Sequence, residues 1–263
     1  DITLKSGQSF GAGSGSVTVE SGRSPHISGS TKISTGDSQG RSGSLKFGSG
    51  QVVNGGSGDI IFWGSEGVEQ SGSVIIGSGS NSDGKSGFVK VSSGDVGNGE
   101  SGNITLWSKS DSSGASGHIL VKTGSSSMGM SGQISIQTGS SSSKSGNIVI
   151  STGDGVREAG KVLVAAGSSQ STGNGGGILI MSGNGGGQGG GITIASGKGT
   201  EQSGGMISLL SGSSEVATGG ILRMETGSGE SSGPIIITTG IARSENSGSI
   251  MVSTGSSTSG GSG

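Results

Sequence analysis

The chain has 263 residues and a formal net charge of −2; 63 residues are glycine, whereas only 26% are apolar and 2% aromatic. Average proteins carry roughly 7% glycine and 45–50% apolar residues, so this composition excludes an ordinary enzyme of one or two globular domains. It also excludes a basic face for nucleic acid, a membrane span of ~20 apolar residues, and any disulfide or thiolate metal site, because there is no cysteine.

A nine-residue pattern, S-G-x-I-x-I-x-T-G, recurs from one end of the chain to the other. Clear copies are Ser131-Gly-Gln-Ile-Ser-Ile-Gln-Thr-Gly139, Ser145-Gly-Asn-Ile-Val-Ile-Ser-Thr-Gly153 and Ser247-Gly-Ser-Ile-Met-Val-Ser-Thr-Gly255. The first residue of each copy expected to face inward, apolar everywhere except Thr31, stands at positions 2, 17, 31, 45, 60, 74, 89, 104, 119, 134, 148, 162, 178, 192, 207, 222, 235 and 250. The mean period over these eighteen copies, (250 − 2)/17, is about 14.6 residues, and single intervals run from 13 to 16. Such a fixed period is typical of repeat architectures.

Each copy alternates at a period of two residues, which is the signature of a strand. Ile134 and Ile136 are expected to face inward, and Ser135 and Gln137 outward. A short apolar strand cannot bury its apolar side alone, but stacked copies can. We therefore predict an all-β fold, a parallel β-solenoid with a flattened two-sided coil and about eighteen rungs of ~14.6 residues. An antiparallel meander is disfavoured because hairpin dipeptides do not recur at a fixed offset.

The outward positions of the predicted strands change in character along the chain. In the first four copies they are polar, with Lys5, Glu20, Lys32 and Lys46 among them, whereas later copies carry apolar residues there. Strands that are apolar on both sides are normally covered on both. We predict a lateral-packing face made of Ile61, Trp63, Ile75, Leu120, Val149, Leu163, Leu179, Met181, Leu210, Ile236 and Met251.

No helix, loop or atypical repeat precedes the first copy or follows the last. Because open solenoid ends expose unpaired backbone groups, we expect residues 1–263 to be one continuous, uncapped array, either a segment of a longer chain or a unit of a filament. The expected partner is another copy of the chain, bound end to end, laterally or both.

Motifs that suggest chemistry have simpler interpretations. Residues 79–86 match the phosphate-binding pattern G-x-x-x-x-G-K-S, but a further strand is expected after them where that site requires a helix. The only two histidines, His26 and His118, are far apart in sequence, and the acidic residues after strand-closing glycines are too few for a calcium-binding roll, which indicates turn residues. A carbohydrate-active β-helix would need paired carboxylates, yet Glu20 and Glu225 are about fourteen rungs apart. We therefore predict no enzyme activity, no cofactor and no metal.

Glycans are the expected modification. Asn103-Ile104-Thr105 is the single N-glycosylation sequon, and the Ser/Thr-rich arcs suit O-linked glycans if the protein is secreted. The stacked S-G-S-I-x-I-S-T-G unit resembles the Ser/Gly-rich repeat proteins of algal and protist cell surfaces, and its coil size is similar to that of insect antifreeze solenoids. The first resemblance implies an extracellular or cell-surface location.

These patterns predict an extracellular structural protein that forms a filament, surface hair or sheath. An ice-binding solenoid and the stalk of an adhesin or fibre are the alternatives. Ice binding would require threonine at both outward positions of each strand, and no copy has this arrangement. Instead, Thr35, Thr123, Thr138, Thr152, Thr226, Thr239 and Thr254 each directly precede a closing glycine, mostly on the inward side.

Overall fold

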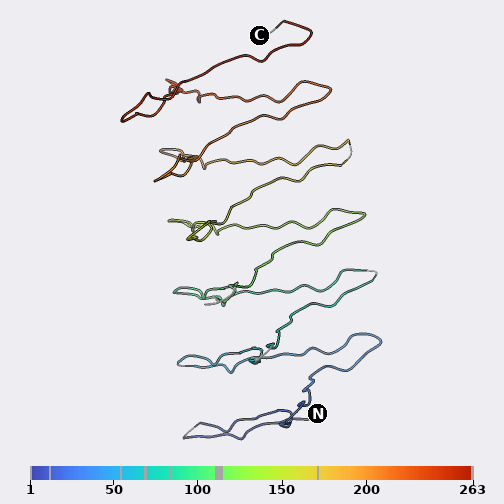
Figure 1. Ribbon diagram of the computed structural model, residues 1–263. Coiled ribbons are helices and arrows are strands. Elements are labelled where there is room, and N and C mark those ends of the chain that lie inside the picture. Colours follow the sequence, from blue (N-terminus) through green and yellow to red (C-terminus); the bar gives the residue numbers. More distant parts are fainter. Residues whose placement is uncertain are drawn as a thin grey trace. The chain divides into compact units, whose positions relative to one another are not determined.

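A computed structural model describes residues 2–11, 13–53, 55–67, 70–82, 84–109, 115–170 and 172–261. Within these ranges the chain contains no helices and no strands, so there are no element bounds to give. It runs as short extended segments joined by loops, at which the chain reverses its direction (Figure 1). Two units can be distinguished, Asp1–Ile134 and Ser135–Gly263, and both have this local organisation.

The predicted all-β parallel solenoid is wrong for the described residues. A solenoid requires each extended segment to exchange backbone hydrogen bonds with a neighbour about 4.8 Å away. The backbone hydrogen bonds found in the described ranges outside regular elements join loop ends, and none joins two extended segments. The predicted ~14.6-residue period is therefore expressed as a succession of extended segments and loops, not as stacked strands.

The loops close where one extended segment ends and the next begins. Gly176 N–H donates to Gly167 O at 2.9 Å, and Gly190 N–H donates to Gly183 O at 3.0 Å. Equivalent bonds are Gly72–Ser65, Gly87–Gly79, Gly205–Gly197 and Gly220–Gly212. These six Ser/Gly arcs are thus closed loops, whereas the predicted solenoid required each arc to return as a second extended side of the coil.

In every one of these bonds the donor is a glycine that stands two residues before the first inward residue of a copy. We call this glycine the loop-base glycine. Glycine occupies this position in all seventeen copies after the first. A Cβ placed on Gly190 would lie 3.3 Å from Ser182 Cβ, and one placed on Gly160 would lie 3.3 Å from Thr152 Cγ2. Glycine avoids this crowding at both positions, whereas a Cβ on Gly58 or Gly233 would meet nothing within 4 Å. The same crowding is avoided at Gly87, Gly176, Gly205 and Gly220.

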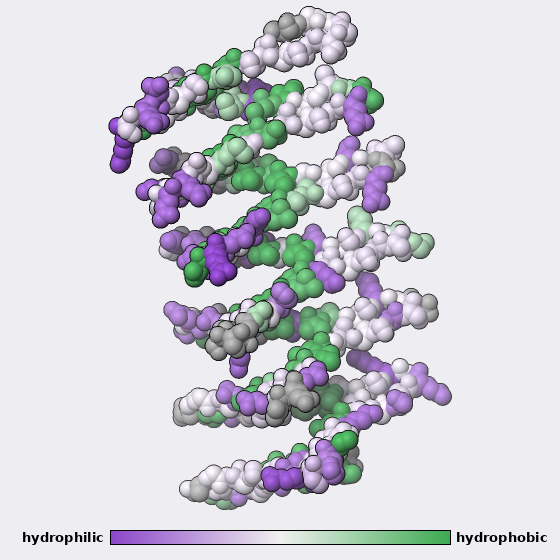
Figure 2. Space-filling model, in the orientation of Figure 1, coloured by the Kyte–Doolittle hydropathy of each residue, from purple (hydrophilic) through white to green (hydrophobic). Residues whose placement is uncertain are grey.

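No described residue is buried, so this part of the chain forms no apolar core. The accessible surface of the chain is 27007 Å², whereas a compact protein of 25.0 kDa exposes about 10,000 Å² and the unfolded chain about 36,000 Å². Most apolar side chains follow the extended segments, and the loops are mainly hydrophilic or neutral (Figure 2). Some loops also expose an apolar residue, such as Phe10, Val156 or Val216. Folding of a single chain into this form therefore leaves its apolar side chains in water.

Candidate association surface

Each residue of the predicted lateral-packing face is exposed on an extended segment. Ile61, at 64%, is the least exposed member and Ile75, at 91%, the most exposed. Ile61, Trp63, Ile75 and Leu120 belong to the first unit, and the other seven belong to the second. The stacking at about 4.8 Å that was expected to merge them into one strip is absent from the described ranges, because no strand ladder forms there.

Within most extended segments, only the first inward side chain is clearly less exposed than the rest. From Val17 to Ile250, the apolar first inward residues are 49–59% exposed, whereas second inward residues such as Ile136, at 74%, and Ile150, at 75%, are as exposed as the predicted packing face, at 64–91%. The first inward residue is shielded more because it lies two positions after the loop-base glycine, which contacts the preceding segment. Arg223 and Glu225, two residues apart, project together and form an ion pair at 2.5 Å, as a period of two residues requires.

Sequence analysis missed the role of the small residue that precedes the closing position. Ser78 Oγ donates to Gly87 O at 2.9 Å, and Thr152 Oγ1 donates to Gly160 O at 3.4 Å. Four of the five half-buried residues in the described ranges stand just before a closing position, and Gly199 is the exception. The five residues are Ser6, Ser21, Ser108, Gly199 and Thr226. The signal was available in the sequence, because this position is serine, threonine, alanine or glycine in every copy.

This contact also accounts for the threonine column considered for ice binding. A Cβ on the following loop-base glycine would lie 3.5 Å from Thr35 Cγ2 and 3.6 Å from Thr123 Cγ2. The same relation, at 3.3–3.8 Å, holds for Thr138, Thr152 and Thr239. These threonines are therefore turned towards the base of a loop and do not form a flat outward array.

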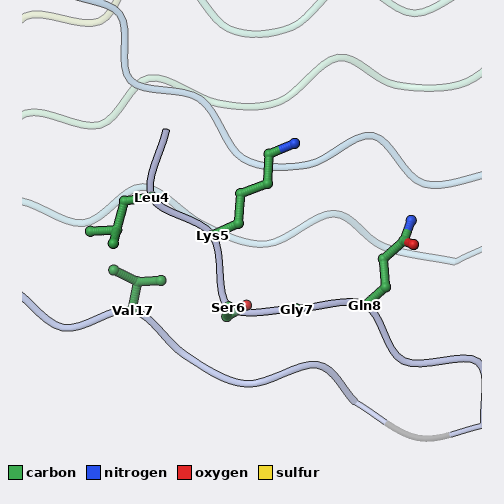
Figure 3. A pocket seen from close by; sticks show the side chains of 6 residues that line it. All are labelled: Leu4, Lys5, Ser6, Gly7, Gln8 and Val17. Atoms are coloured by element: carbon green, nitrogen blue, oxygen red, sulfur yellow. The ribbon is translucent and has the colours of Figure 1, made fainter. Parts of the chain in front are cut away.

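An open hollow of about 640 Å³ lies where the first extended segment passes the second (Figure 3). Leu4 and Val17 point towards one another across it, whereas the side chains of Lys5 and Gln8 extend away (Figure 3). Lys5 is the single charged residue in its lining. Leu4 and Val17 are 73% and 49% exposed, so the hollow is an uncovered part of the apolar surface.

A second hollow, of about 900 Å³, collects apolar side chains of the first unit. Val19, Ile61, Phe62, Trp63 and Val74 line it together with Thr31, Ser65 and Ser73. Beside it, the rings of Phe47 and Phe62 meet edge to face, with centroids 6.3 Å apart. Two predicted packing residues, Ile61 and Trp63, are thus brought together, in a lining that contains no ionisable group.

The residues that resembled chemical motifs form ordinary loops. The loop at 79–86, of which Asp83 lies outside the described residues, is closed by the bond from Gly87 to Gly79 and is followed by an extended segment. Asp95 Oδ1 accepts the N–H of Val96, and His26 N–H donates to Ser24 Oγ, so both residues stabilise local turns. In the described ranges, no three histidine or acidic side chains gather in a way that could hold a metal ion.

Asn103 lies just after a loop-base glycine, in an exposed extended segment. The strand that was expected to begin here is not formed, so the amide is accessible. The described residues also contain no helix that is long and apolar enough to cross a membrane.

No family model matches this chain, and no curated protein or solved structure does either.

Proposed function

We propose that this chain is a structural protein that assembles with copies of itself into an extracellular filament, surface hair or sheath. The observation that carries the proposal is a regular repeat whose large apolar side chains, where the structure describes them, are all exposed. Apolar patches larger than a few hundred Å² are unusual on soluble monomers and are typical of interaction sites. A surface repeated eighteen times fits a partner with the same period, and a second copy of the chain has that period.

The loops support an extracellular setting. They are rich in serine, threonine and glycine, and within the described ranges they are exposed apart from a few positions such as Gly199. Hydroxyl groups in such loops are accessible to O-linked glycosylation, and Asn103 is accessible to N-linked glycosylation. Hydrophilic loops beside apolar segments also suit an assembly whose segments pack together while its loops contact water.

The ion pair Arg223–Glu225 and the polar outward residues of the early repeats do not provide a reaction centre. Arg223 and Glu225 lie on neighbouring outward positions and are 75% and 61% exposed. An exposed pair of this kind contributes little free energy and leaves no carboxylate poised beside a second one. We therefore assign a non-enzymatic role.

Assembly can be tested with the purified full chain. Sedimentation velocity over a hundredfold range of concentration, followed by electron microscopy of the same samples, should show species that grow with concentration and become elongated. A refolded sample and a freshly purified sample should behave alike, which controls for irreversible aggregation. A chain that stays a monodisperse monomer at high concentration, with no larger native assembly in its source, would refute the proposal.

A further inference from the structure

One stretch of the second unit combines apolar segments with a complete absence of charge. Between Lys161 and Lys198, residues 162–197 include no acidic or basic residue, a run of 36. The next longest uncharged run is the 21 residues 123–143, between Lys122 and Lys144, and the longest that lies wholly within the first unit is the 14 residues between Lys5 and Glu20. The uncharged stretch contains three extended segments, 162–166, 178–181 and 192–195.

This stretch also belongs to the part of the chain in which four successive loops, up to Gly220, are closed in the same way. The loops after its three segments are closed by the same backbone bond, at 2.9 Å for Gly176–Gly167, 3.0 Å for Gly190–Gly183 and 2.9 Å for Gly205–Gly197. The three segments are therefore held by loops with equivalent ends. In the described residues of the stretch, which exclude Ser171, the backbone groups of the three segments make no hydrogen bond to other backbone groups.

From these observations we infer that residues 162–197 are the primary self-association site of the chain, and that the partner is the same stretch of a second copy. This inference rests on the proposed function and names the surface that starts the assembly. The three segments pair with their counterparts through backbone N–H and C=O groups, and the apolar side chains pack between the copies.

The area available is sufficient for a stable contact. Nine large apolar side chains of the stretch are 52–87% exposed; they are Val162, Leu163, Val164, Ile178, Leu179, Ile180, Met181, Ile192 and Ile194. Together they expose roughly 1,000 Å² per copy, compared with about 800 Å² per partner in a standard protein interface.

The absence of charge selects a second copy as the partner. When a segment pairs with itself, every charged residue lies near its own kind, and like charges directly opposite are destabilising. Elsewhere in the chain, several segments carry such residues, for example Lys32, Lys46 and Lys122, and no other uncharged run contains more than one whole segment. Residues 162–197 can pair with themselves without this repulsion. Segments of low charge and high β propensity, without proline, are those that associate most readily.

The test compares two full-length variants that differ only in where the charge is placed. Leu179→Lys and Leu120→Lys change the same residue type at the same position of the repeat, and the two leucines are 77% and 76% exposed. We expect Leu179→Lys to raise the concentration at which assembly begins at least tenfold, because it places like charges opposite one another between paired copies. Leu120→Lys should raise this concentration less than twofold.

A second measurement locates the contact directly. Because the chain has no cysteine, Met181→Cys introduces a single site for a pyrene label. Assembled Met181→Cys protein should show strong excimer emission, whereas Trp63→Cys, at a position of equal exposure (74% against 75%), should show at least fivefold less.

The outcomes separate this inference from the function on which it rests. If both lysine variants assemble alike, or if the label at position 63 gives the stronger excimer, the stretch is not the primary site, although the chain is still a self-assembling protein. If the unmodified chain does not assemble at all, the proposed function fails and this inference fails with it.

Discussion

Replacement of the loop-base glycine Gly190 by alanine should open the loop between Gly183 and Gly190. The added Cβ would lie 3.3 Å from Ser182 Cβ and 3.4 Å from both the nitrogen and the oxygen of Gly183. Since the Gly190 N–H donates to Gly183 O at 3.0 Å, relief of this crowding lengthens or breaks the closing bond. A hydrogen bond of this kind contributes about 1 kcal/mol, which corresponds to about a fivefold change in the ratio of closed to open loop.

The neighbouring glycine gives a matched control. A Cβ on Gly191 would meet nothing within 4 Å, so Gly191→Ala removes one glycine without crowding. It should leave the closed loop unchanged or stabilise it by about 0.4–1 kcal/mol, because alanine reduces the freedom of the open chain. Amide hydrogen exchange of residue 190, measured by NMR at a concentration below assembly, reports the ratio of closed to open loop. Equal exchange in the two variants would refute the role assigned to the loop-base glycine.

Four further expectations follow from the same structure. Gly185→Ala should disrupt the turn that contains it, since a Cβ there would collide with Gln188 O. Gly186→Ala should be tolerated, because a Cβ at that position has open space. The chemical shifts of residues 184–189 report the difference between the two variants. Ser78→Ala should raise the rate of amide hydrogen exchange at residue 87 up to about fivefold, because the 2.9 Å bond from Ser78 Oγ to Gly87 O is lost. Ser93→Ala, at the same repeat position, should leave the exchange at residue 87 unchanged. The concentration at which assembly begins should rise by less than twofold between 50 mM and 500 mM salt, because residues 162–197 are uncharged. This is roughly the range over which exposed charges become screened. A strong salt dependence would point to charged contacts. No thermal hysteresis is expected at a micromolar concentration of the protein. Faceted ice crystals with a freezing-point gap would contradict the conclusion that the threonines are turned towards the loop-base glycines.

The local features of this chain could be predicted from its sequence. The ~14.6-residue period and the division into apolar segments and Ser/Gly loops are properties of neighbouring residues. The alternation of exposure expected from a period of two is confined to the start of each segment, because second inward residues such as Ile136, at 74%, are as exposed as Leu120, at 76%. The sequence also argued against a phosphate site at residues 79–86, and the segment that follows them is extended.

Pairing between segments could not be predicted in the same way. An alternating segment such as Ile134–Ile136 faces its side chains identically whether or not its backbone is paired, so the pattern does not distinguish a solenoid from an unpaired extended chain. Pairing must also overcome the entropy lost on ordering loops that are rich in glycine, the residue that loses most on folding. In a single chain, the described residues bury no side chain, so they supply no apolar burial to offset that cost.

A second copy changes this balance, because it supplies burial that one chain lacks. The three closed loops between Gly167 and Gly205 fix the ends of neighbouring segments in an equivalent way. Once segment 178–181 has paired with its counterpart, pairing of 162–166 and 192–195 takes place within one complex, and the effective concentration of the partner segment is then set by a short loop. Weak contacts between single segments thus combine into a strong contact between chains. The loop-base glycines, which contact no other chain in this scheme, would then control assembly through the spacing of the segments that do.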